Sequence, residues 1–154
     1  MTSSRLSIWL LCAGAVVLAC GPRAQSTVSS AADSAGVSAP DGTVIASSLD
    51  VAVGSDVRLT LHITNTSDQP LELRFSSGQT HDFAVTDSTG RELWRWSADR
   101  MFTQALQTRV IGAGQSVNYE ERWNPGGATG ELTAIGELTS SSHPVVKRVE
   151  FSLP

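Results

Sequence analysis

The sequence predicts an all-β protein, in which one antiparallel β-sandwich domain follows a signal peptide and a disordered tether. Apolar and polar residues alternate with a period of two in several segments after Thr43, which is typical of strands with one buried face. Clusters of turn-forming residues separate these segments at intervals of roughly 8 to 12 residues, as in β-sandwiches. No window of the domain shows convincing helical periodicity, so we expect strands throughout.

The first 19 residues predict a lipoprotein signal peptide. Arg5 precedes the apolar run Leu6–Ala19, which is shorter than the roughly 20 residues that a membrane-spanning helix needs. The run ends in Leu-Ala-Cys, which resembles the lipobox of bacterial lipoproteins, so Cys20 is expected to be lipidated and to become the first mature residue. The alternative is a plain secretory signal with an incidental cysteine. We therefore expect an extracytoplasmic protein anchored to a bacterial membrane, the outer membrane if the cell is Gram-negative, because Gly21 rather than Asp follows the cysteine.

Residues 20–42 predict the lipidated cysteine and a flexible tether. Ser, Ala and Gly dominate the segment after Cys20, and Val28 and Val37 are its only large aliphatic residues. Such a segment cannot bury enough apolar area to offset the entropy lost on ordering. The folded domain is therefore expected over residues 43–154, a length sufficient for one hydrophobic core.

The segments from Thr43 to Trp96 are expected to form the first five strands. The most regular is Val57–Asn65, in which apolar side chains occupy every second position. The cluster Asn65–Pro70 predicts a turn; it begins with a triplet that fits a glycosylation sequon, but the bacterial signal favours the turn. Asp87–Gly90 predicts a hairpin turn, because its glycine tolerates a positive φ angle. The other expected strands of this half are Thr43–Val53, Leu71–Phe75, Asp82–Thr86 and Arg91–Trp96.

Four further strands are expected after residue 106, each followed or preceded by turn-forming residues. A glycine-rich turn follows the first of them, and an Asn-Pro-Gly-Gly turn follows the second. Neither cysteine remains available for a disulfide, because Cys12 leaves with the signal and Cys20 would carry lipid. The tryptophans and branched aliphatic residues must therefore stabilise the domain. These last strands are Gln107–Ile111, Val117–Trp123, Gly130–Thr139 and Pro144–Leu153.

Charge and motif content argue against several classes of function. The chain has 11 Lys and Arg against 15 Asp and Glu, so it lacks the basic surface that nucleic-acid binding requires. His62, His81 and His143 show no metal-ligand spacing, and no cofactor motif is present. His81 and Asp82 are adjacent strand residues that point to opposite faces, and no G-x-S-x-G nucleophile elbow exists. We expect neither an enzyme nor a bound metal or cofactor, and we expect a monomer.

Several motifs in fixed order resemble the BsuPI family, which is named for an intracellular proteinase inhibitor. The family pattern reads N-x-S-x-x-P, F-x-S-G-Q-x-[YH]-D-F-x-V, [VL]-W-R-W-S and M-F-[TS]-Q. The resemblance covers about Val57 to Trp123, and implies an immunoglobulin-like sandwich that inhibits a serine protease of the subtilisin type. The lipoprotein signal differs from the intracellular location in the family name, so the identity of the protease stays open. The matching segments are Ile63–Leu73, Phe75–Gln79, His81–Asp87, Glu92–Ser97, Met101–Gln104 and Tyr119–Trp123.

Two tryptophans precede the segment that could contact a partner. Trp94 and Trp96 have the same parity on an expected strand, which places both on the core side, with Leu93 and Arg95 outward. Trp123 is their expected partner on another strand. Phe83 is expected in the same core.

The segment after these tryptophans is the candidate protease-contact loop. Polar residues at 97–100 are followed abruptly by Met101 and Phe102, which are expected to pack under the loop and fix its shape; the alternative is an exposed apolar tip. A pre-shaped loop binds at a lower entropic cost, and an extended segment can add a strand to a protease cleft. The candidate residues are Ser97, Asp99, Arg100, Met101, Phe102, Thr103 and Gln104.

Two alternatives remain open at the level of the sequence. The segment Ser76–Asp82 is a rival contact site, or else a turn in which Asp82 bonds to Arg95 or to a tryptophan indole. The partner is either a protease or an envelope protein. In the second case the domain would be a non-inhibitory immunoglobulin-like binding module on the membrane.

Overall fold

The structure, a computed structural model, describes residues 44–154. The predicted signal peptide, the lipidation at Cys20 and the tether over residues 20–42 lie outside the described residues. Residues 44–154 include no helix that is long and apolar enough to cross a membrane.

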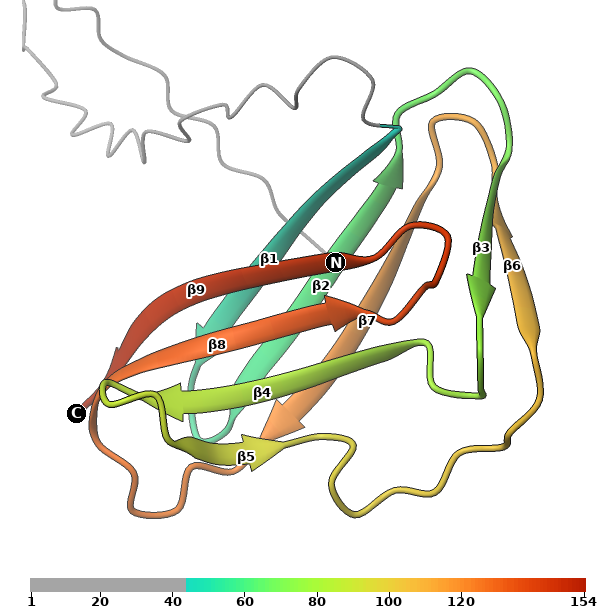
Figure 1. Cartoon of the computed structure of the whole chain (residues 1–154). Helices are drawn as coiled ribbons and strands as arrows, with labels where there is room; N and C mark the ends of the chain where they lie inside the picture. Colours follow the sequence, from blue (N-terminus) through green and yellow to red (C-terminus); the bar gives the residue numbers. More distant parts are fainter. Residues whose placement is uncertain (1–43) are drawn as a thin grey trace, which may run out of the picture. The chain divides into compact units, whose positions relative to one another are not determined.

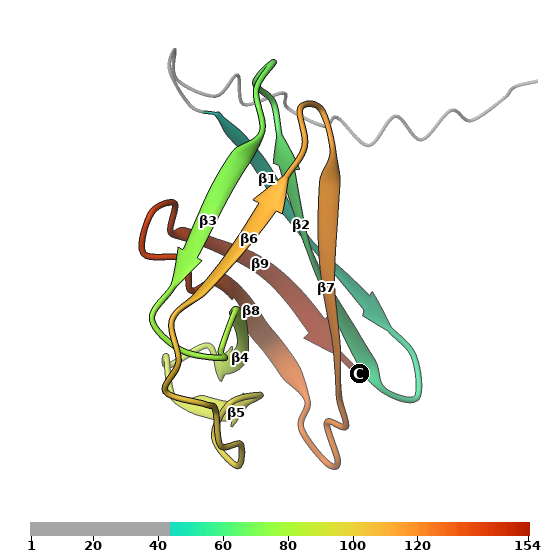
Figure 2. The same cartoon turned by 90° about the vertical axis from the view of Figure 1, so that its right-hand side faces the viewer.

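Nine strands form three antiparallel sheets in this part of the chain (Figures 1 and 2). In the first sheet β2 lies between β1 and β7, in the second β3 pairs with β6, and the third has the order β5-β4-β8-β9. The strands are β1 (Ile45–Val53), β2 (Val57–Asn65), β3 (Leu71–Phe75), β4 (His81–Asp87), β5 (Glu92–Arg95), β6 (Gln107–Ile111), β7 (Ser116–Trp123), β8 (Gly130–Leu138) and β9 (Val145–Leu153).

The all-β antiparallel prediction is confirmed, and each strand expected from the alternation is present. The ends of β4 and β5 each differ by one residue from those expected. β4 begins at His81, and β5 ends at Arg95, so Trp96 belongs to the following turn and not to the strand. The immunoglobulin-like strand arrangement stays a prediction.

One hydrophobic core joins the sheets. The inward side chains of β2, at every second position from Val57 to Ile63, are fully buried, as the alternation predicts. β1 and β2 contact β8 and β9 across this core. The two sides of the core approach closely at Gly136 of β8, where an added Cβ would lie 3.0 Å from Cδ1 of Leu49 and 3.2 Å from Cε1 of Phe83.

A buried asparagine joins two turns at one end of the domain. The Nδ2 group of Asn65 donates to the carbonyl oxygens of Gln69 (2.7 Å), Ile111 (3.0 Å) and Gly112 (3.1 Å). Its Oδ1 accepts from the backbone N–H of Ser67 at 3.0 Å. Because Asn65 is fully buried, the sequon-like triplet serves as a structural turn and is closed to glycosylation in the folded domain.

Candidate functional site

The segment from Trp96 to Leu106 links β5 to β6 and contains the predicted contact loop. In Figure 1 it is the yellow trace between these two strands. The backbone N–H of Trp96 donates to the carbonyl of Phe83 in β4 at 2.8 Å, and the N–H of Arg100 donates to the carbonyl of Ser97 at 3.2 Å. The start of the loop is therefore tied to the sheet.

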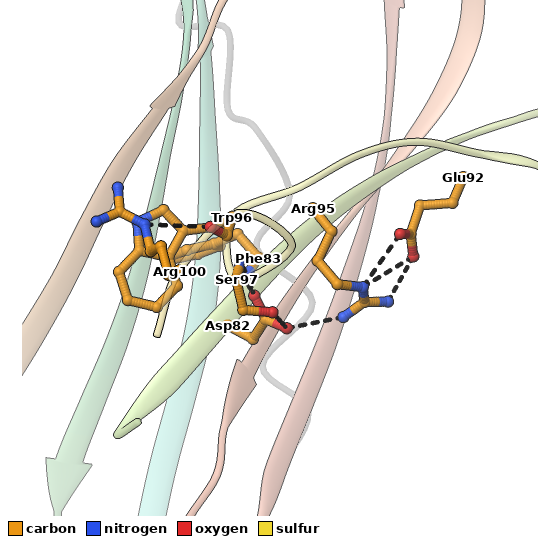
Figure 3. Close-up of polar contacts among 7 residues, drawn as sticks. All are labelled: Asp82, Phe83, Glu92, Arg95, Trp96, Ser97 and Arg100. Carbon is orange, nitrogen blue, oxygen red and sulfur yellow. Dashed lines mark hydrogen bonds and ion pairs between the residues drawn. The ribbon is translucent and has the colours of Figure 1, made fainter. Parts of the chain in front are cut away.

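Asp82 of β4 holds the same region through its carboxylate (Figure 3). Oδ2 accepts from the hydroxyl of Ser97 at 2.7 Å and from Nη1 of Arg95 at 2.8 Å. Oδ1 accepts from the backbone N–H groups of Phe83 (2.9 Å) and Ser97 (3.2 Å). The hydrogen bonds that Arg95 donates to Glu92 and to Asp82 raise its pKa, so the guanidinium stays protonated. The expected bond between Asp82 and Arg95 is confirmed.

Trp96 is the platform on which the loop rests. The guanidinium of Arg100 lies 4.3 Å from the ring centroid of Trp96, and its Nε donates to the Trp96 carbonyl at 3.1 Å (Figure 3). The ring of Phe102 contacts the same indole, with centroids 5.6 Å apart. The indole Nε1 is buried and has no hydrogen-bond partner among the described residues, so ring contacts hold this side chain. A cation–π contact and an aromatic pair thus fix the residues on both sides of Met101.

His81 of β4 supports the platform from the sheets. Its imidazole stacks on Trp96 with a centroid distance of 4.3 Å and an interplanar angle of 28°. It also lies 4.7 Å from the ring of Tyr119 in β7 and contacts the edge of Phe83. Trp96 is therefore positioned by His81 of β4, which Tyr119 of β7 contacts in turn.

The expectation that Met101 and Phe102 both pack under the loop is wrong for Met101. Phe102 is half-buried against Trp96, but the side chain of Met101 is fully exposed, at 100%. Arg100 and Phe102 both contact the Trp96 ring, so the side chain between them points away from it. Met101 therefore forms an exposed apolar tip on a loop whose flanks are fixed.

The second fixed point of the loop is Gly78, in the rival segment Ser76–Asp82. Its backbone N–H donates to the carbonyl of Thr103 at 2.8 Å. A Cβ at Gly78 would lie 2.6 Å from Oγ1 and 3.3 Å from the backbone nitrogen of Thr103, so a larger residue would force Thr103 to shift. The amide of Gln104 adds a bond to the carbonyl of Phe102 at 3.3 Å. The structure thus places the rival segment beneath the loop, as its support.

The candidate loop residues divide into those that face the domain and those that face solvent. Ser97 and Phe102 are half-buried and hold the loop in place. Sequence reasoning missed Gly78 and His81 as supports, although both lie within the motifs it singled out. The solvent-exposed members are Asp99, Arg100, Met101, Thr103 and Gln104.

The tryptophan predictions are confirmed in part. Trp123 is buried and lies 6.4 Å from the half-buried Trp94, ring centroid to ring centroid, as expected. Trp96 is only half-buried and lies beyond the strand. Leu93, expected to point outward, is half-buried against the core, because the register between β4 and β5 shifts and leaves Leu93 as the additional residue of a bulge. Phe83 is fully buried, as predicted.

The environment of His81 favours its neutral form. Burial lowers its pKa, and Arg109 acts in the same direction. The bond from its Nε2 to Glu121 Oε1, at 3.3 Å, and the charges of Glu121 and Asp82 oppose this effect. Since its partners in the stack are Trp96 and Tyr119, protonation of His81 would place a charge directly beneath the loop platform.

We expect the stability of the domain to fall as the pH drops below about 6.5, the ordinary histidine pKa. The folded pKa of His81 is lower than the unfolded one, so the unfolded state binds more protons in this window and the free energy of unfolding rises with pH. Urea unfolding between pH 7.5 and 5 measures this slope. His81→Gln should reduce it; equal slopes for wild type and His81→Gln would contradict the prediction.

Another polar cluster surrounds His62 in the first sheet. His62 lies on the outer face of β2, where its ring nitrogens contact Asp50 (2.9 Å) and Asn118 (2.8 Å). Within residues 44–154 there is no group of three His, Cys, Asp or Glu side chains placed to hold a metal ion.

Comparison with known proteins gives one family. The family model described as "BsuPI: Intracellular proteinase inhibitor" matches residues 45–143, which is more than half of the chain and wider than the span of the motifs. Among curated proteins, none matches the sequence significantly.

The similar solved structures are distant. A structural-genomics target solved by X-ray crystallography has 15% identity and a TM-score of 0.45, over 73% of this chain and 88% of its own. The ApaA protein of Bordetella pertussis has 17% identity and a TM-score of 0.37, over 71% of this chain and 93% of its own. A β-glucosidase of Listeria innocua has 15% identity and a TM-score of 0.36, over 69% of this chain and 16% of its own. These likenesses are too low to bear on function.

Proposed function

Because this chain belongs to the BsuPI family of intracellular proteinase inhibitors, we propose that its domain inhibits a serine protease of the subtilisin type through the loop Ser97–Gln104. The domain itself carries out no catalysis in this proposal. It acts as a monomer that occupies the cleft of the protease.

The observation that carries the proposal is the attachment of the loop on both sides of its tip. Arg100 and Phe102 rest on one Trp96 ring, and the Thr103 carbonyl is bound by Gly78. A segment held in this way loses little conformational entropy when it enters a cleft, so most of its contact energy is available for affinity. Proteases bind extended segments by main-chain pairing, which suits a segment with no helical or sheet hydrogen bonds of its own.

A titration tests the inhibitory function. A soluble form that begins at Gly21 retains every described residue and is added stepwise to subtilisin, with residual activity and the intactness of the domain recorded. Stoichiometric loss of protease activity with an intact domain is the expected result. Asp68→Ala is a matched control, because Asp68 is exposed in the turn between β2 and β3, at the opposite end of the domain in Figure 1. Full protease activity at high molar excess would instead favour the non-inhibitory module that binds an envelope protein.

We further propose that the inhibitor is displayed outside the cytoplasm, anchored through lipid on Cys20 and held off the membrane by the tether. The apolar run, the Leu-Ala-Cys sequence and the Ser/Ala/Gly composition after it support this. Wild-type protein should be found in the membrane fraction of a bacterial host and should take up labelled fatty acid. Cys20→Ser should abolish the labelling; undiminished labelling of that variant would contradict the anchor.

A further inference from the structure

Met101 is the most exposed large apolar residue of the described range. Its side chain is fully exposed, and it makes no hydrogen bond, ion pair or ring contact within residues 44–154. The residues on either side of it, Arg100 and Phe102, are both held on Trp96. The loop therefore presents a single unbranched apolar side chain, and leaves its backbone N–H and carbonyl available for pairing with a partner.

This arrangement matches the requirements of a protease specificity pocket. A pocket accepts one side chain from an extended segment while the backbone on both sides pairs with the cleft. Because Met101 loses no contact when it leaves solvent, the whole of its apolar surface contributes to association. The methionine side chain is flexible and polarisable, so it can adapt to apolar pockets of different shapes.

We propose, on the basis of the inhibitory function proposed above, that Met101 occupies the specificity pocket of the target and that this pocket is apolar and uncharged. A pocket with a buried carboxylate, as in trypsin, would have its charge left unpaired by a methionine. Charged residues are kept at the flanks, where Asp99 and Arg100 are exposed. The loop thus selects proteases of the subtilisin and chymotrypsin specificity and discriminates against those that cleave after Lys or Arg.

The test uses wild type and variants of the form that begins at Gly21, against subtilisin, chymotrypsin and trypsin. Met101→Leu should keep inhibition of the first two within a few-fold. Met101→Asp should weaken it by about 100-fold or more, because a carboxylate would be buried without a partner. Met101→Lys should lose the same inhibition and gain inhibition of trypsin. Since Met101 makes no internal contact, urea unfolding of all three variants should match wild type.

The matched control is Leu106→Asp. Leu106 is another highly exposed apolar residue, at 87%, but it lies beyond the part of the loop held by Trp96 and Gly78. This variant should inhibit subtilisin as wild type does.

Oxidation provides a second measurement. The chain has two methionines, Met1 and Met101, so in the form that begins at Gly21 peroxide converts Met101 alone to the polar sulfoxide. Inhibition should fall on oxidation and return after treatment with methionine sulfoxide reductase, whereas Met101→Leu should not respond.

The outcomes separate this assignment from the function on which it rests. Inhibition by wild type that Met101→Asp retains in full would overturn the role of Met101 and leave the inhibitory function standing. Inhibition of trypsin but not of subtilisin or chymotrypsin by wild type would overturn the apolar pocket. A wild-type protein that inhibits none of the three would contradict the proposed function, and the role of Met101 with it.

Discussion

Replacing Trp96 by Ala is expected to abolish inhibition of subtilisin and to lower the free energy of unfolding by about 2–4 kcal/mol. The change removes the ring that contacts Arg100 and Phe102 and that stacks on His81. The loop would then sample many conformations, and it would lose this conformational entropy when it binds the protease. Urea unfolding and a titration of residual protease activity measure the two effects.

A matched control separates the shape of the loop from the stability of the domain. Trp94 is also half-buried and stacks on Trp123, but it has no ring contact with the loop. Trp94→Ala should therefore cost a similar amount of stability and still inhibit subtilisin while the domain remains folded. If folded Trp96→Ala inhibits as well as wild type does, the loop does not depend on this platform and the proposed contact site is wrong.

Replacing Asp82 by Ala should lower the free energy of unfolding by about 3 kcal/mol, and it should make the loop susceptible to proteolysis. The carboxylate is buried and accepts bonds from Ser97 and Arg95, so its removal leaves those donors without an acceptor. This loss of stability is small for a broken buried ion pair. Arg95 keeps its ion pair with Glu92, and the Arg95 side chain is 37% exposed, so solvent screens its charge. Urea unfolding and limited digestion followed by mass spectrometry measure the change.

Two further variants isolate the contribution of the buried carboxylate. Asp82→Asn keeps a carbonyl oxygen for the backbone donors but loses the charge opposite Arg95, so its cost should be intermediate. Glu92→Gln weakens a more exposed ion pair to the same guanidinium and should cost less than about 1 kcal/mol. Equal effects of Asp82→Ala and Glu92→Gln would show that Asp82 does not hold the loop.

The strands were predictable from the sequence because their pattern is local. In β2 the side chains alternate between a buried and a polar face, and this alternation follows from the pleat of one strand alone. β5 was predicted less well, since it is four residues long and contains a bulge that places both Leu93 and Trp94 against the core. A bulge depends on the register with β4, and the alternation within β5 does not report that register.

The loop was predictable as a segment between two strands, but the side chain that it exposes was not. The motifs and the polar-to-apolar change at residues 97–102 located the loop, and the Asp82–Arg95 bond was among the expected contacts. Met101 and Phe102 are adjacent and both apolar, so composition gave no reason to bury one and expose the other. The Trp96 ring makes that distinction, because it contacts Phe102 and Arg100 on either side of Met101.

By itself, the sequence determined the strand positions, the antiparallel all-β class and the family, because each depends on neighbouring residues or on motifs read in order. Only the tertiary structure decided which side chain the loop presents. The position of the Trp96 ring depends on His81 of β4, which Tyr119 of β7 contacts in turn. Contacts between strands so distant in the sequence leave no periodic signal, so the exposed tip at Met101 follows from the packing of the sheets.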